Sequence, residues 1–135
     1  MYYIGVDLGG TRIATGDLDT DGNIVAKASA KTLGHRPPEE ITESIADTIK
    51  AAIAAAEITE DEVSGIGIGV PGSFNVEDGS IILTNNMNLS HFPLTKELQK
   101  YINKPVYLGN DANCAVLGEM IAGGAQGYKD VIMVT

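Results

Sequence analysis

Three short segments that alternate apolar and polar residues stand at the start of this 135-residue chain. An alternation with a period of two is typical of strands that bury one face. The segments cover residues 2–8, 13–18 and 24–30, and tight turns rich in glycine and aspartate join them at residues 9–11 and 19–22. Successive strands joined by tight turns run in opposite directions. The sequence therefore predicts an antiparallel meander of three strands, which restricts the chain to folds that begin with one.

Helices alternate with strands in the rest of the chain. Isoleucines recur every four residues within residues 39–56, which indicates a helix with one apolar face. Further strands are predicted over residues 64–70, 81–83, 106–108 and 131–134, and further helices over residues 94–102 and 111–122. This order is typical of an α/β fold with a mixed sheet that is parallel in its second half and has flanking helices. We expect residues 1–130 to form one lobe and residues 131–135 to begin another.

Charge and composition exclude several classes of partner. The chain has 9 Lys and Arg against 18 Asp and Glu, a net charge of −9, whereas nucleic acids and anionic lipids need a basic surface. A single cysteine, Cys114, excludes an intrachain disulfide and a cysteine-based zinc site in this chain, and we expect it to pack inside. No signal peptide and no apolar run long enough to cross a bilayer is present, so the prediction is a soluble cytoplasmic protein without nucleic-acid or membrane partners.

The segment Asp-Leu-Gly-Gly-Thr-Arg at residues 7–12 follows the first predicted strand directly. Its glycines allow backbone N–H groups to converge on an anion, while Thr11 adds a donor and Arg12 a cation. Asp7 could hold Mg²⁺ through a water molecule. A glycine pair alone more often marks a simple hairpin turn with a capping threonine. The complete hexapeptide after a strand is a more specific signal for a phosphate site.

A second glycine-rich segment, residues 67–72, formally matches the GxGxxG pattern of dinucleotide-binding folds. The residues that follow it, 73–79, predict a turn, so no helix N-terminus is available for a pyrophosphate. The chain also lacks the GxxxxGK[ST] sequence of P-loop enzymes. These glycines are better explained by a strand that runs close to a ligand or to a neighbouring strand.

Two polar segments are further candidates for a site. Asn-Asp-Ala-Asn at residues 110–113 ends a predicted strand and opens a predicted helix, where Asn and Asp are also common helix caps. A helix N-terminus favours a negative charge, and an ionised Asp111 within reach of a substrate hydroxyl can accept its proton. Residues 85–88 carry three amides that could line a polyol site or simply be solvated. His35 and His91 have no metal-type spacing and are predicted to lie in loops.

Taken together, these segments resemble the ROK family of sugar kinases and repressors, which belongs to the actin, Hsp70 and hexokinase superfamily. Residues 7–12 resemble its first phosphate motif, although most members have Lys where this chain has Arg12. Residues 67–72 are similar to its glycine-proline strand end, Asn88-Leu89 to its sugar loop, and residues 110–113 with Gly118-Glu119 to its catalytic segment. The resemblance covers nearly the whole chain and implies a ribonuclease-H-like lobe of the actin-like ATPase fold.

The resemblance also implies a role for each candidate residue. Asp111 would be the general base that takes a proton from a hexose hydroxyl, at C6, and Asn110 would hold a neighbouring hydroxyl. Gly72 and Asn88 would contact the sugar. Asp7 would lie near Mg²⁺. The residues that would face the phosphates of ATP are Gly9, Gly10, Thr11 and Arg12. The implied activity is that of a glucokinase-like hexose kinase at the start of glycolysis.

The resemblance also places several parts of the family's site after residue 135. These are the second phosphate motif, a sugar-binding Glu and His, a cysteine zinc motif and the adenosine pocket. We therefore expect little activity from this chain alone, and exposed apolar surface that promotes association into a homo-oligomer. Near the sugar loop, His91 and Phe92 stand where many members have an aromatic residue.

Three functions remain open, and the sequence names no particular sugar. The first is the hexose kinase, and the second is a sugar-sensing or regulatory module without catalysis. The third is another ATPase of the superfamily, acetate-kinase-like or actin-like, against which residues 110–113 argue. The first predicted strand starts at Met1 with no helix-turn-helix before it, and the net charge is negative, which favours the enzyme branch over the repressors.

Overall fold

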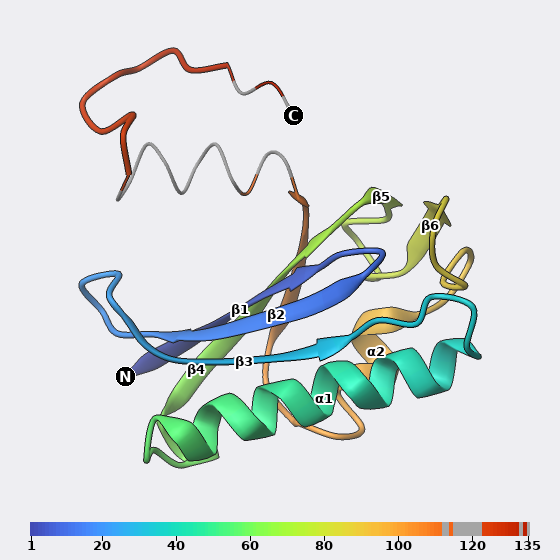
Figure 1. Cartoon of the computed structure of the whole chain (residues 1–135), viewed down its shortest axis with the longest axis horizontal. Coiled ribbons are helices and arrows are strands. Elements are labelled where there is room, and N and C mark those ends of the chain that lie inside the picture. Colours follow the sequence, from blue (N-terminus) through green and yellow to red (C-terminus); the bar gives the residue numbers. More distant parts are fainter. Residues whose placement is uncertain (112–113, 115–122, 133, 135) are drawn as a thin grey trace.

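The computed structural model describes residues 1–111, 114, 123–132 and 134. A five-stranded sheet forms its centre, the helix α1 covers one face of that sheet, and a small two-stranded sheet lies at one end (Figure 1). The elements are β1 (Tyr2–Leu8), β2 (Arg12–Leu18), β3 (Ile24–Lys31), α1 (Pro38–Ala55), the 3₁₀ turn η1 (Glu60–Glu62), β4 (Val63–Val70), β5 (Gly72–Phe74), β6 (Ile81–Thr84), α2 (Leu94–Leu98) and β7 (Val106–Asn110).

The predicted meander and the predicted parallel half of the sheet are both confirmed. β1 pairs with β2 and β2 with β3 in antiparallel register, while β1 pairs with β4 and β4 with β7 in parallel register. The strand order is β3-β2-β1-β4-β7. Since β1, β4 and β7 run in the same direction, their carboxyl ends meet at one edge of the sheet, which is also where ligands bind in open α/β sheets. The predicted α/β fold class is therefore correct.

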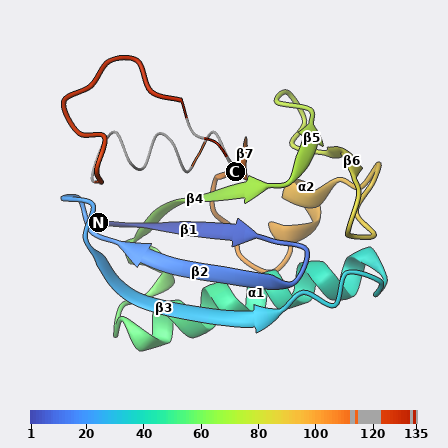
Figure 2. The ribbon, with the colours of Figure 1, turned by 45° about the horizontal axis from the view of Figure 1, so that its top comes forward.

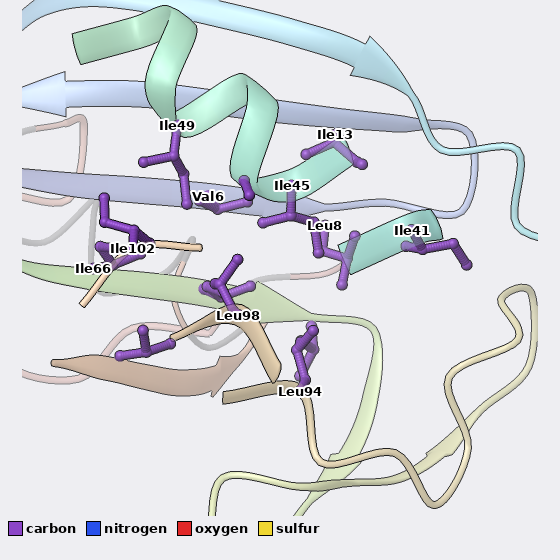
Figure 3. Close-up of a cluster of buried hydrophobic side chains, with 14 of the residues drawn as sticks. Val6, Leu8, Ile13, Ile41, Ile45, Ile49, Ile66, Leu94, Leu98 and Ile102 are labelled. Carbon is purple, nitrogen blue, oxygen red and sulfur yellow. The ribbon is translucent and has the colours of Figure 1, made fainter. Parts of the chain in front are cut away.

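The core lies between the sheet and α1 (Figure 3). Ile41, Ile45 and Ile49 of α1 are completely buried against strands β1, β2 and β4 and the residues of α2. Pro38 takes the first helical position, where its missing N–H costs no hydrogen bond. Burial of each isoleucine contributes roughly 1.5–3 kcal/mol. The four-residue repeat seen in the sequence is therefore the stripe that fixes α1 to the sheet.

Three elements differ from the prediction. β5 was expected to be part of a turn, but its three residues pair with β6. The helix expected over residues 94–102 ends at Leu98, and Ile102 reaches the core through successive turns instead. Among the described residues at the end of the chain, Val131, Ile132 and Val134 belong to no strand. The helix expected over residues 111–122 lies largely outside the described residues, although Asp111 and Cys114 have helical backbone.

One of the buried residues of β2 carries a carboxylate. Asp17 on β2 is completely buried, and among the described residues neither of its carboxylate oxygens has a hydrogen-bond partner. Burial raises the pKa of Asp17 above its ordinary value of 3.8, because a charge without partners is poorly solvated there. A group whose pKa is higher in the folded state stabilises the fold most at low pH, and this contribution is lost as the pH rises through the folded pKa.

Replacing Asp17 with Asn removes this titration at almost constant volume. We expect Asp17→Asn to be more stable than the parent protein at pH 8, with a difference that shrinks as the pH falls to 5. Urea denaturation at the two pH values measures this, with Asp21→Asn in an exposed turn as the matched control. A difference that does not change with pH, or a loss of stability at pH 8, would contradict the assignment.

Candidate functional site

The candidate site lies at the carboxyl edge of the three parallel strands (Figure 2). In the sheet register Asp7 at the end of β1 pairs with Gly69 of β4, and Gly69 pairs with Gly109 of β7. Asn110 is the last residue of β7, and Asp111 follows it with helical backbone. The parallel pairing thus brings the first predicted phosphate residue and the predicted base to the same edge, although about a hundred residues separate them along the chain.

One cavity of about 600 Å³ joins Asp7, Gly69 and Asp111 on the face of the sheet away from α1. Asp7 and Arg12, at the two ends of the predicted phosphate turn, line it together with Asp111. Its floor contains glycines where other strands would carry side chains: Gly5, Gly16, Gly67 and Gly69. A methyl group at Gly67 would meet no atom of the described residues within 4 Å, so these residues leave space above this strand. The cavity is large enough for a small-molecule ligand.

The phosphate turn, residues 9–12, is closed by a hydrogen bond from the backbone N–H of Gly9 to the carbonyl oxygen of Arg12, at 3.0 Å. A Cβ atom at Gly9 would lie 2.9 Å from that same oxygen. Only glycine therefore fits without a shift of the backbone, which explains the first glycine of the motif. Thr11 and Arg12 are exposed, and their polar groups can reach a ligand.

The amide loop, residues 84–90, is held by buried side chains and exposes its amides to solvent. Met87 and Leu89 are buried in the core, whereas the three asparagines between β6 and Leu89 are exposed: Asn85, Asn86 and Asn88. Thr84 donates its hydroxyl to the carbonyl oxygen of Met87 at 2.8 Å, which fixes the turn. A Cβ atom at Gly10 would lie 3.1 Å from the Cβ of Asn86, so this loop contacts the phosphate turn.

The structure separates the predicted sugar residues into two places. Of the predicted site residues, Asp7, Arg12 and Asp111 line the cavity of about 600 Å³. The predicted sugar residues Gly72, Asn88 and Asn110 do not line it, and neither do Gly9, Gly10 and Thr11 of the phosphate turn. Gly72 pairs with Thr84, and a Cβ atom there would overlap the carbonyl oxygen of Leu83, so packing alone explains the glycine. Asn88 donates its backbone N–H to Gly34 at 2.8 Å and its side-chain amide to the carbonyl oxygen of Arg36 at 3.3 Å. His35 and His91 lie exposed in turns, as predicted.

The prediction that Cys114 packs inside the protein is wrong. Its thiol is exposed and lines the same cavity as Asp7 and Asp111. Partial desolvation raises the pKa of Cys114, and the negative charges of Asp111 and Asp7 raise it further. The physical reason for the error is that the glycine face of the sheet leaves space next to Cys114, whereas apolar helix residues usually face a filled core.

Alkylation of Cys114 reports on this arrangement without any substrate. Since the thiolate is the reactive form, we expect iodoacetamide to react with Cys114 at pH 8 more slowly than with an unperturbed thiol. Asp111→Asn removes one of the neighbouring charges and should increase the rate. Asp78→Asn, on the turn between β5 and β6, serves as the control and should leave it unchanged. Equal rates in all three proteins would refute the proximity of the two carboxylates to the thiol.

The donor set at this edge suits Mg²⁺ bound together with phosphate groups. Among the residues that the structure describes, no cluster of three or more His, Cys, Asp and Glu side chains is placed to hold a metal ion by itself. Mg²⁺ prefers one or two carboxylates, water molecules and substrate phosphates over a cage of protein ligands. Asp7 and Asp111 supply two carboxylates to one cavity, which matches that preference.

Two residues near the site were not singled out from the sequence. Thr32 is completely buried and donates its hydroxyl to the carbonyl oxygen of Gly9 at 2.6 Å. Arg36 donates from its guanidinium to the carbonyl oxygen of Thr32 at 2.7 Å. Neither has a motif or a spacing that marks it, because both act on backbone oxygens.

Within the described part of the chain, no helix has the length and the apolar character needed to span a membrane.

Known proteins similar to this chain were found in sequence and in structure. The ROK family profile matches residues 3–135. The glucokinase of Thermotoga maritima is 39% identical over 137 residues, which cover 100% of this chain and 41% of that protein. The glucokinase of Halalkalibacterium halodurans is 36% identical over 99% of this chain and 41% of its own length. A xylose repressor of Caldicellulosiruptor bescii is 31% identical over 98% of this chain and 33% of its own length.

Solved structures agree with these relatives. The ROK hexokinase of Thermus thermophilus superposes with a TM-score of 0.84 at 34% identity, over 94% of this chain and 41% of that one. A ROK family glucokinase of Streptomyces griseus, solved in complex with glucose and AMPPNP, gives a TM-score of 0.74 at 33% identity, over 94% of this chain and 38% of that one. The chain thus spans about two fifths of the length of these relatives. It belongs to the ROK family.

Proposed function

We propose that this chain is the base-carrying lobe of an ATP-dependent, glucokinase-like hexose kinase. The observation that supports the proposal most is the shared cavity, which is lined by Asp7 of β1, Arg12 of the phosphate turn and Asp111. Phosphoryl transfer needs a base for the acceptor hydroxyl and a binding site for the donor phosphates within one small space. The similarity to two glucokinases and to a ROK hexokinase agrees with this proposal.

On the acceptor side, Asp111 takes the proton from a hexose hydroxyl, at C6, as that oxygen attacks the terminal phosphorus of ATP. Asn110 holds a neighbouring hydroxyl, and Gly72 and Asn88 contact the sugar. The carboxylate of Asp111 lies at the carboxyl edge, where it can reach a ligand in the cavity. Correct alignment of two bound reactants removes much of the entropic barrier of the reaction.

On the donor side, the backbone of Gly9, Gly10 and Thr11 and the guanidinium of Arg12 face the phosphates of ATP. The tight closure of the turn at Gly9 supports this role, because it holds successive N–H groups in a compact loop. Mg²⁺, when bound, would neutralise charge on the transferred phosphoryl group. Asp7 would hold it through water.

The organisation of the whole protein is part of the proposal. Residues 1–130 form the N-terminal ribonuclease-H-like lobe, and residues 131–135 lead into a second lobe. The apolar side chains of Ile132 and Val134 are exposed here, as expected if the second lobe packs against this segment in the whole protein. We propose a cytoplasmic protein that binds a hexose and ATP. We also propose that it self-associates, which light scattering tests directly.

The alternative function is sugar sensing without catalysis. The observation that favours it is the similarity to a xylose repressor over 98% of this chain. A regulator of this kind would bind a sugar at the same edge but would not turn over ATP. The net charge of −9 argues against nucleic-acid binding by these residues themselves.

A coupled assay of ADP release with Mg-ATP and a panel of hexoses separates these functions. It is run on this chain and on the complete reading frame that contains it. Turnover that depends on one hexose supports the kinase and identifies the acceptor. Hexose binding without turnover in either protein favours the sensing module. ATP hydrolysis with no response to any hexose would favour a different ATPase of the superfamily.

A further inference from the structure

Three loops meet at the carboxyl edge, and one buried threonine lies between them. They are the phosphate turn, the amide loop and residues 32–36, which connect β3 to α1 and which we name the connecting loop. Thr32 is completely buried. Its hydroxyl donates to the carbonyl oxygen of Gly9 at 2.6 Å, and its backbone N–H donates to that of Thr11 at 2.9 Å. One residue therefore holds the phosphate turn at two positions, Gly9 and Thr11.

Arg36 fixes the other side of this threonine. Its Nη2 and Nε atoms donate to the carbonyl oxygen of Thr32 at 2.7 and 3.2 Å. Its backbone N–H also donates to the carbonyl oxygen of Leu33 at 3.0 Å. Leu33 has a φ of 47°, a conformation that residues with side chains adopt at a cost. The charged hydrogen bonds of Arg36 support this turn against that cost.

The amide loop rests on the same connecting loop. Asn88 donates its backbone N–H to Gly34 and its side-chain amide to the carbonyl oxygen of Arg36. A Cβ atom at Gly34 would overlap the backbone oxygen of Asn86, so the two loops are in direct backbone contact. Hydrogen bonds therefore run without a break from Gly9 through Thr32 and Arg36 to Asn88.

We propose that Thr32 and Arg36 are positioning residues that join the phosphate turn and the amide loop into one unit, so that the nucleotide and the sugar bind cooperatively. The inference rests on the function proposed above. A ligand that orders one loop also orders the other through the connecting loop, so the second ligand loses less conformational entropy when it binds. Neither side chain needs to contact a ligand for this effect.

The test measures the factor by which saturating hexose lowers the dissociation constant of AMPPNP, in the complete reading frame. We expect the hexose to tighten AMPPNP binding by roughly fivefold or more in the parent protein. In Thr32→Val and in Arg36→Met this factor should fall toward one, whereas Thr32→Ser should retain it because the hydroxyl remains. Thr20→Val, in the exposed turn between β2 and β3, is the matched control and should behave like the parent protein.

Each outcome separates this inference from the proposed function. If the parent protein turns over no hexose, the kinase assignment fails. If it turns over a hexose but shows no binding cooperativity, or if both variants keep the full factor, the positioning role is refuted. A purely structural role would lower the fraction of folded protein without changing this ratio of dissociation constants. Should Thr32→Val fail to fold, Arg36→Met decides, since Arg36 is only half-buried.

Discussion

Replacing Asp111 with Asn in the complete reading frame is expected to lower hexose phosphorylation by roughly 10²–10⁴-fold, the usual contribution of a general base. Asn has the same shape and can still form hydrogen bonds with a sugar, but it cannot accept the proton. Asp111 lines the cavity with Asp7 and Arg12, so the loss should appear in kcat while hexose binding is retained. Turnover at saturating substrate and calorimetric titration with hexose measure the two effects separately.

Asp21→Asn provides the matched control for this experiment. It makes the same chemical change in the exposed turn between β2 and β3, far from the carboxyl edge along the strands. It should retain the turnover of the parent protein. Retention of turnover within about tenfold by Asp111→Asn would reject the role of general base. Loss of hexose binding together with turnover would instead indicate that Asp111 only holds the sugar.

The strands of the meander and the helix α1 could be predicted from the sequence, because the patterns that indicate them are local and periodic. The meander follows from alternation and tight turns, and α1 follows from isoleucines at every fourth position. β5 could not be predicted, since three residues contain no period and the strand exists only through its pairing with β6. α2 was overextended because the turns after Leu98 keep the spacing of apolar residues after the helix has ended.

Only the part of the candidate site that lies at the ends of strands could be predicted from the sequence. Asp7 lies near the end of β1 and Asp111 directly follows β7, and parallel pairing brings such strand ends together. The environment of Cys114 was not predictable, because it depends on a sheet face made of glycines. Thr32 and Arg36 were also missed, since their side chains bind backbone carbonyl oxygens, and such contacts leave no recognisable pattern in the sequence.

The second large effect is expected at Gly72, where a methyl group has no room. Its Cβ atom would overlap the backbone oxygen of Leu83 and lie 3.3 Å from the Cγ2 of Thr84. The obstacle is backbone of the paired strand β6, so no rotation of a side chain can relieve it. We expect Gly72→Ala to lower the free energy of unfolding by about 1–3 kcal/mol, as overpacking of a tight contact does. Urea denaturation monitored by circular dichroism measures this change.

Gly67→Ala is the matched control, because it makes the same substitution where the added methyl group meets no atom of the described residues within 4 Å. Its stability should stay within about 0.5 kcal/mol of the parent protein or rise slightly, since alanine loses less backbone entropy on folding. The contrast between the two variants isolates the contact of Gly72 with Leu83 from the general effect of Gly to Ala. Because β6 leads directly into the amide loop, Gly72→Ala should also weaken hexose binding. Unchanged stability in Gly72→Ala would show that β5 and β6 separate easily, and the glycine would then be explained by the ligand and not by packing.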